Sequence, residues 1–362
     1  MRQSAHKDIL KFLQTVIPGG AQGQLSRRIC LMACLIQACV HNGHSRLESL
    51  SEATEAYQAQ KKSSLLQQAK RWLNNKWTDW QTFYLPFAKH FLQGLSAKGE
   101  LVFIIDGSQT GHANTTLMLS VLCRGCAIPV AWVVKKGEKG HFLEEMHLDL
   151  LQMITPICPP GCRVVLLGDG EFDGQLLRQW CIDRQWIFVV RTSCDRQIDF
   201  NGAIARFDSI QTTRNICFIP DGLPLANAVY WRGKGHSKPL FLLTNMELGY
   251  EACHYYKRRF KIETLFKHLK SGGFYLHKTR LKCPVKVANL IIVVAFSFIF
   301  SFCMGAFIKE NEPVKNLENI VRIDRLSKIT PIAIAQLAIK NNCDCALTFF
   351  SDLSKNLLWV FT

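Results

Sequence analysis

The spacing of apolar residues changes along the chain and separates a helical first part from a mixed second part. Before residue 99, apolar residues recur at helical spacing in three segments, at 9–16, 28–40 and 64–73. Turns rich in glycine, proline or polar residues separate these segments, and such residues interrupt helices. The pattern therefore predicts a small helical region over residues 1–98.

From residue 99 onward, short apolar and β-branched runs end at glycine or polar residues, as strands do. The expected elements are strands at 101–105, 116–122 and 128–134, a helix at 141–154, a strand at 163–167, a helix at 174–183 and a strand at 186–190. The first three strands are spaced closely enough for an antiparallel meander. The order β-β-β-α-β-α-β resembles a ribonuclease-H-like core. The expected fold class is therefore α/β, with a mixed sheet flanked by helices.

The later part of the chain first loses and then regains regular elements. Turn residues between short apolar runs predict a β-rich insertion, and the elements expected after it are a strand at 240–243 and helices at 250–270 and 287–307. We divide the chain into five segments: a helical basic DNA-binding region at 1–98, the first part of the core at 99–192, the insertion at 193–237, the second part of the core at 238–307, and a helical C-terminal extension at 308–362.

The charge of the chain indicates the class of partner that it binds. The chain carries 44 Lys and Arg against 28 Asp and Glu, a formal net charge of +16. Ten of the basic residues lie between 254 and 286, where Glu263 is the single acid. A basic chain favours a polyanionic partner, most commonly nucleic acid. A solvated charged face is the alternative, but it leaves the lone acid inside the basic block unexplained.

The cysteines and one apolar stretch allow weaker inferences. Fifteen cysteines are present, but Cys123 and Cys126 form a single CxxC without a second pair at zinc-finger spacing. The first residues are polar and charged, so we expect no secretory signal and reduced cytoplasmic thiols. Residues 287–307 are apolar enough and long enough to cross a bilayer. A fully buried core helix has the same pattern.

Three acids stand where catalytic carboxylates are often found. Asp106 and Asp169 each follow a predicted strand and precede a glycine, although a simple Asp-Gly turn is the alternative for either one alone. Glu263 belongs to a set with Tyr256, Arg259 and Lys270, and spacings of three, four and seven place this set on one stripe of a helix. Ion pairing along the helix explains the charges but leaves Tyr256 and Lys270 without a role.

The set Y-x2-R-x3-E-x6-K, from Tyr256 to Lys270, resembles the signature of the insertion-sequence-four group of bacterial transposases. In that group the first acid closes the first core strand, as Asp106 does here. Its second acid opens a motif like Asp-Arg-Gly-Phe, whereas this chain has Asp-Gly-Glu-Phe from Asp169, so Asp173 is the alternative second acid. The resemblance covers about residues 100–305. It includes an apolar helix after the glutamate helix, which favours the buried interpretation and no membrane contact.

The resemblance implies a DNA transposase of the DDE type, which cuts at the ends of its element and joins them to target DNA. Asp106, Asp169 and Glu263 would be the catalytic residues and would hold two Mg²⁺ ions, with Asp106 bridging both. Mn²⁺ has similar ligand preferences and is expected to substitute for Mg²⁺.

The expected partners follow from the same resemblance. Tyr256, Arg259 and Lys270 would contact DNA phosphates near the cut. Trp231, followed by Arg232-Gly233-Lys234 in the insertion, would stack on an unpaired base, with packing on the core as the alternative. The protein would bind double-stranded DNA, namely the terminal inverted repeats and the target. It would act as a homodimer on DNA in the bacterial cytoplasm.

Three other functions are compatible with the sequence. A ribonuclease-H-like nuclease that does not transfer strands would share the fold and the three acids. A catalytically inactive, transposase-derived DNA-binding protein would keep the basic regions. A membrane protein anchored by residues 287–307 would bind no metal. Strand transfer from a pre-cut end separates the first of these from a transposase.

Overall fold

The computed structural model describes residues 2–55, 62–137, 142–210, 212–233, 238–312, 329–351 and 353. The chain begins with a helical region, as predicted. Its helices are α1 (Arg2–Val16), α2 (Gly23–Asn42), α3 (Leu47–Glu55), α4 (Lys62–Leu73), α5 (Trp80–Phe83) and α6 (Leu85–Ser96). The segments at 9–16, 28–40 and 64–73, where helical periodicity was strongest, lie within α1, α2 and α4.

The centre of the described fold is an eight-stranded mixed sheet. Its strands are β1 (Glu100–Gln109), β2 (Asn114–Cys123), β3 (Cys126–Lys136), β4 (Arg163–Gly168), β5 (Ile187–Arg191), β8 (Ile216–Leu223), β9 (Ala226–Trp231) and β10 (Leu240–Thr244), in the order β3-β2-β1-β4-β5-β10-β9-β8. The first three strands are antiparallel, whereas β4 is parallel to β1 and β5 is parallel to β4. This arrangement of β1 to β5 confirms the predicted ribonuclease-H-like core.

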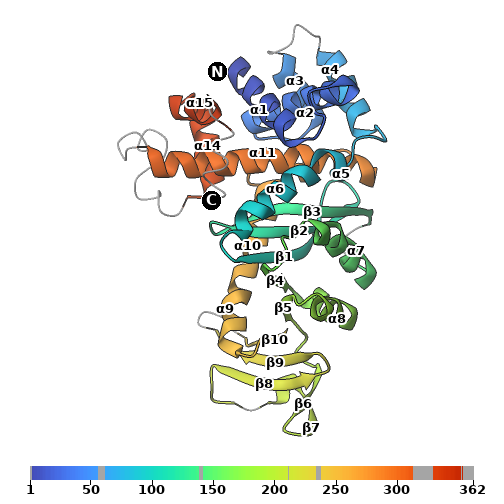
Figure 1. Ribbon diagram of the computed structural model, residues 1–362, viewed down its shortest axis with the longest axis vertical. Coiled ribbons are helices and arrows are strands. Elements are labelled where there is room, and N and C mark those ends of the chain that lie inside the picture. Colours follow the sequence, from blue (N-terminus) through green and yellow to red (C-terminus); the bar gives the residue numbers. More distant parts are fainter. Residues whose placement is uncertain are drawn as a thin grey trace.

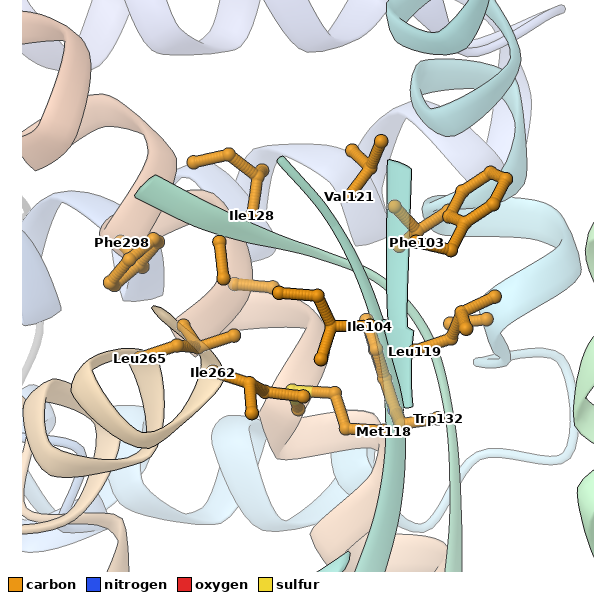
Figure 2. Close-up of a cluster of buried hydrophobic side chains, with 14 of the residues drawn as sticks. Phe103, Ile104, Met118, Leu119, Val121, Ile128, Trp132, Ile262, Leu265 and Phe298 are labelled. Atoms are coloured by element: carbon orange, nitrogen blue, oxygen red, sulfur yellow. The ribbon is translucent and has the colours of Figure 1, made fainter. Parts of the chain in front are cut away.

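Helices cover both faces of this sheet. On β1, Phe103 stacks on Trp186 at 5.7 Å between ring centroids, and Trp186 contacts Trp180 of α8 (Gln175–Asp183). The next residue, Ile104, points the opposite way, toward Ile262 of α10 (Lys261–Lys270), as Figure 2 shows. Successive side chains of a strand alternate between faces, so α8 and α10 lie on opposite sides of the sheet. The helix α7 (Glu144–Ile154) contacts β2, β3 and α8.

The long apolar helix α11 (Pro284–Asn311) joins the helical region to the sheet. It lies between α2 and β3 (Figure 1), and its most apolar 18-residue window is 94% buried. Two of its buried polar side chains are satisfied internally: the Asn289 side-chain amide donates to the carbonyl of Leu73, and the Ser297 hydroxyl donates to the carbonyls of Ile36 and Val293. In the described part of the chain, this is the one helix long and apolar enough to span a membrane, and the fold buries it as a core helix.

The prediction of a single helix at 250–270 is wrong at Phe260. The segment forms two helices, α9 (Gly249–Arg259) and α10, with Phe260 between them. No proline or glycine occurs at the break. The two helices contact different strands: α9 contacts β4 and β5, whereas α10 contacts β1 and β3. The break at Phe260 therefore separates the part of the segment that packs on β4 and β5 from the part that packs on β1 and β3.

The predicted insertion is β-rich but continues the main sheet. Its last strands, β8 and β9, join the sheet through β10, which is antiparallel to β5. A separate hairpin, β6 (Gln197–Phe200) and β7 (Ala203–Arg206), turns at Asn201-Gly202, where both residues have positive φ, at 57° and 81°. Lys234, part of the predicted base-stacking motif, lies outside the described residues.

The predicted C-terminal extension is helical where it is described. The helix α14 (Pro331–Lys340) contacts α11 and α2, and α15 (Asp344–Ser351) contacts α1 and α11. The extension is thus connected to the helical region at the opposite end of the chain (Figure 1). Residues 313–328, 352 and 354–362 lie outside the described part.

His268 in α10 provides a test of the packing between the core helices. Burial lowers the pKa of His268 below its ordinary value of 6.5, and the nearby charge of Lys267 acts in the same direction. Because the pKa in the fold is below that of the unfolded chain, this histidine contributes stability above pH 6.5. That contribution is lost as the pH falls through the pKa in the fold. We expect His268→Gln to reduce the loss of stability between about pH 7.5 and about pH 5.

The measurement is the urea midpoint of wild type and variant at both pH values. His90→Gln, at an exposed position on α6, is the matched control and should behave as wild type. An equal loss of stability with acid in wild type and in His268→Gln would contradict the prediction.

Candidate active site

The three predicted acids line one open cleft of about 740 Å³. We call it the carboxylate cleft. Its wall is formed by residues from β1, β2, the segment before α7, the segment after β4, the end of α9, and α10 with the residue that follows it: Asp106, Gly107, Ser108, Thr115, Phe142, Asp169, Glu171, Arg259, Glu263, Phe266, Lys267, Lys270 and Ser271. Segments distant in sequence therefore bring together the acids and the cations predicted from the helix pattern.

The parallel pairing of β1 and β4 sets the positions of Asp106 and Asp169. Ile104 lies opposite Leu167 in this pair, and each aspartate follows its strand residue by two positions. Both carboxylates therefore leave the same end of the sheet at neighbouring strands. The Gly107 amide donates to Asp106 at 2.7 Å, and the Glu171 amide donates to Asp169 at 3.0 Å, so local backbone bonds orient both side chains.

Arg259 connects the strand acid with the helix acid. Its guanidinium donates to Glu263 at 2.6 Å and lies 3.5 Å from Asp106. The Arg259 side chain is only 9% exposed, whereas Glu263 is 55% exposed on the rim. The helix breaks at Phe260, between Arg259 and Glu263. The two side chains are nevertheless in contact, so the stripe predicted for a straight helix is retained at these two positions.

The environment of Asp106 disfavours a negative charge on its carboxylate. Burial and the nearby charge of Asp169 raise the pKa of Asp106 to about 7, and Arg259 opposes this shift in part. A carboxylate that is buried beside another carboxylate resists ionisation unless positive charge is supplied. The cleft is therefore suited to a positively charged ligand that contacts Asp106.

The remaining predicted contact residues differ in position. Lys270 lines the cleft. Tyr256 is 1% exposed on α9, and its ring lies 5.7 Å from the Arg259 guanidinium carbon. Trp231 is 4% exposed at the end of β9, with the Lys257 ammonium 5.4 Å from its ring. In the described structure, neither Tyr256 nor Trp231 is among the residues that line the carboxylate cleft.

Asp173, the alternative second acid, lies in a different environment. Its carboxylate forms an ion pair with Arg196 and accepts a hydrogen bond from the Thr192 hydroxyl at 2.5 Å. It lines a neighbouring pocket with Arg191 and Lys238 rather than the carboxylate cleft. The structure thus brings Asp169, and not Asp173, together with Asp106.

Two charged residues of the cleft were not predicted as part of the site. Glu171 accepts a hydrogen bond from the Phe142 amide at 2.5 Å and lies 3.7 Å from the His147 ring. Its signal in the sequence was the replacement of the expected glycine in the Asp-Gly-Glu-Phe motif. Lys267 was considered only as an ion-pair partner of Glu263, yet it lines the cleft beside Lys270.

Comparisons with known proteins identify the family. The model of the family described as "Transposase DDE domain" matches residues 77–300. A search of curated proteins found no match. Among solved structures, the chain is similar to piggyBac transposase in a synaptic complex with hairpin DNA, at 11% identity and a TM-score of 0.47, covering 98% of this chain and 84% of that one.

A second solved structure is the Argonaute of Marinitoga piezophila in complex with guide RNA and target DNA. It has 16% identity and a TM-score of 0.23, and the similarity covers 52% of this chain and 28% of that one. At these identities and TM-scores, neither structural similarity indicates a function for this chain. The family match spans more than half of this chain and includes Asp106, Asp169 and Glu263. The chain therefore belongs to the transposase DDE domain family and is a DNA transposase, an enzyme that cleaves and joins DNA.

Proposed function

We propose that this transposase cuts DNA at the ends of its element and joins the freed 3′-hydroxyl to target DNA, using Asp106, Asp169 and Glu263 as ligands of two divalent metal ions. The observation that carries the proposal is the convergence of these three acids, from two strands and a helix, on one cleft. The resemblance of Tyr256–Lys270 to the insertion-sequence-four signature supports assignment to that group.

The donor atoms suit Mg²⁺, with Mn²⁺ as a substitute, because all three ligands are hard carboxylate oxygens. In the described residues, the three acids do not form a group whose ligand oxygens all lie within 4.8 Å of one another. Two ions would accommodate such a spread better than one ion. Asp106 would be the ligand shared between them, because the charges of both Asp169 and Glu263 act on it.

When bound, the two ions activate the attacking hydroxyl and stabilise the leaving oxygen of the phosphodiester. The protein's own part is to hold the substrate in place. The positive charge of Arg259 offsets the negative charge of the acids in the cleft. Lys267 and Lys270 of α10 bind DNA phosphates through their ammonium groups. Tyr256 packs on Arg259 and supports its orientation. DNA contacts of Tyr256 and Trp231 stay predictions, because both side chains are buried.

The proposed partners are the terminal inverted repeats, the target duplex and a second copy of this chain. The basic segments at 1–98 and 254–286 support duplex binding. We propose a homodimer on DNA because two element ends must be processed together before joining. A bacterial cytoplasm, where the DNA is accessible, is the proposed location.

The direct test is cleavage of a labelled duplex carrying the element's end, with Mg²⁺ or Mn²⁺, by wild type and by Glu263→Gln. This substitution keeps the size of the side chain and removes its charge at a half-exposed position. We expect cleavage to fall by about 100-fold or more while DNA binding is kept. Glu247→Gln, at an exposed position just before α9, is the matched control and should cleave as wild type.

Three other results of this cleavage experiment would each favour a different conclusion. Equal cleavage by wild type and Glu263→Gln would remove Glu263 from the catalytic set. Binding of the element end without cleavage by either protein would favour the inactive DNA-binding alternative. Cleavage without joining of a pre-cut end to target DNA would favour a nuclease.

A further inference from the structure

A second group of potential metal ligands lies in the helical region, away from the carboxylate cleft. The helices α1 and α2 form an antiparallel hairpin, with Gln14 contacting Ser26 near the turn. Cys30 and Cys34 are four residues apart on α2, so both project from one side of that helix. His6 of α1 lies opposite them, and in the described residues these three form the one group of at least three His, Cys, Asp or Glu whose ligand atoms all lie within 4.8 Å.

The distances within this group fit a tetrahedral ion. The Cys34 sulfur lies 3.9 Å from Nδ1 and 4.0 Å from Nε2 of His6. Ligands of a tetrahedral Zn²⁺, with bonds of about 2.3 Å to sulfur and about 2.0 Å to nitrogen, are roughly 3.5–3.8 Å apart. A movement of a few tenths of an ångström therefore brings Cys34 and His6 to coordination distance, which side-chain rotation can supply.

The surroundings of the group leave room for a fourth ligand. Cys34 is 1% exposed, but His6 and Cys30 are partly exposed. A water molecule can therefore approach from the solvent side and complete the coordination, as it does at zinc sites with three protein ligands. Sulfur and imidazole donors favour Zn²⁺ over the hard ions that suit the carboxylate cleft.

Other cysteines in the described residues are not part of such a group of ligands. Cys30 is partly exposed on α2, where it can meet an ion from solvent. On the same helix, burial raises the pKa of Cys39 to about 12. In the CxxC pair between β2 and β3, burial likewise raises the pKa of Cys123 to about 11 and that of Cys126 to about 12. Those thiols stay protonated in the core.

We propose that His6, Cys30 and Cys34 bind one Zn²⁺ ion, with water as the fourth ligand, and that this ion fastens α1 to α2. The consequence is structural. The helix α2 packs on α11, and α1 contacts α15, so an ion between α1 and α2 stabilises the junction of the helical region with α11 and with the C-terminal extension. This inference does not depend on the metal ions proposed for the carboxylate cleft.

The test uses the full-length protein, reduced and freed of metal by a chelator, and titrated with Co²⁺ in the presence of excess Mg²⁺. We expect one equivalent of Co²⁺ to produce thiolate-to-cobalt charge-transfer absorption, which Zn²⁺ then removes. In Cys34→Ser and His6→Gln, Co²⁺ affinity should fall by about 100-fold or more, since loss of a direct ligand should exceed the effect of losing a supporting group. His6→Gln is at a partly exposed position, so this variant guards against misfolding of the other.

Two controls separate this site from other thiols and from the cleft. Cys39→Ala removes a buried thiol of the same helix and should keep the absorption, as should Asp106→Asn. Zn²⁺ should raise the thermal midpoint of wild type but not that of Cys34→Ser or His6→Gln. Absence of thiolate absorption in reduced wild type, or full absorption in both ligand variants, would overturn the proposal.

Discussion

Asp106→Asn is expected to lower the rate of end cleavage by about 1000-fold or more, with DNA binding retained. Asp106 occupies the centre of the carboxylate cleft, where burial and Asp169 raise its pKa and Arg259 approaches it at 3.5 Å. An amide of the same size cannot carry the negative charge that a bridging metal ligand supplies. The measurement is single-turnover cleavage of the element end in Mg²⁺, with binding followed separately by a mobility shift.

The matched control for this prediction is Asp173→Asn. Asp173 lies close in sequence to Asp169 but faces Arg196 and Thr192 outside the cleft. We expect it to lose thermal stability, because its ion pair is broken, while the folded protein still cleaves. Cleavage lost in Asp173→Asn and kept in Asp169→Asn would reverse the assignment of the second acid.

Gly305→Ala is expected to destabilise the fold by about 3 kcal/mol or to displace α14 from α11. A Cβ at Gly305 would overlap the backbone of Pro331, at the start of α14. Backbone atoms cannot rotate out of the way as the end of a side chain can, so the two helices must separate. The measurement is the urea midpoint, with protease cleavage within 313–328 as a second readout of a detached α14.

Gly94→Ala is the control with the opposite expected sign. Gly94 lies within α6, and a Cβ there meets no atom within 4 Å. Alanine should therefore stabilise the helix by about 0.5–1 kcal/mol, because it restricts the unfolded chain more than glycine does. Equal stability of Gly305→Ala and wild type would show that α14 does not pack against α11 as described.

The sequence predicted the elements of the core because their signals are local. Apolar runs that end at glycine or polar residues located β1 to β5, and the expected order of the core was confirmed. The predicted strand end before Asp106 was wrong, because β1 continues through Asp106 to Gln109, but the parallel pairing of β1 with β4 still brings Asp106 and Asp169 to one end of the sheet. Helical spacing identified Arg259 and Glu263 as neighbours, which the 2.6 Å contact shows.

Other features depended on contacts between distant segments and were decided by the tertiary structure. The sequence favoured Asp169 and left Asp173 as the alternative, and only the tertiary structure shows that Asp173 pairs with Arg196 and Thr192 outside the carboxylate cleft. The break at Phe260 separates α9 and α10, which pack on different strands. The burial of α11 required both the helical region and the sheet to cover it.

The proposed zinc site likewise could not be found from local patterns in the sequence. The sequence drew attention to Cys123 and Cys126 because they form a CxxC, but the fold places them in the hairpin of β2 and β3, with Cys123 buried and Cys126 half-buried. His6 and Cys34 are 28 residues apart and belong to no recognisable motif. Periodicity along a chain determines which residues share a strand or a helix face. The pairing of those faces in space, which depends on long-range packing and not on spacing, decided which side chains meet in this protein.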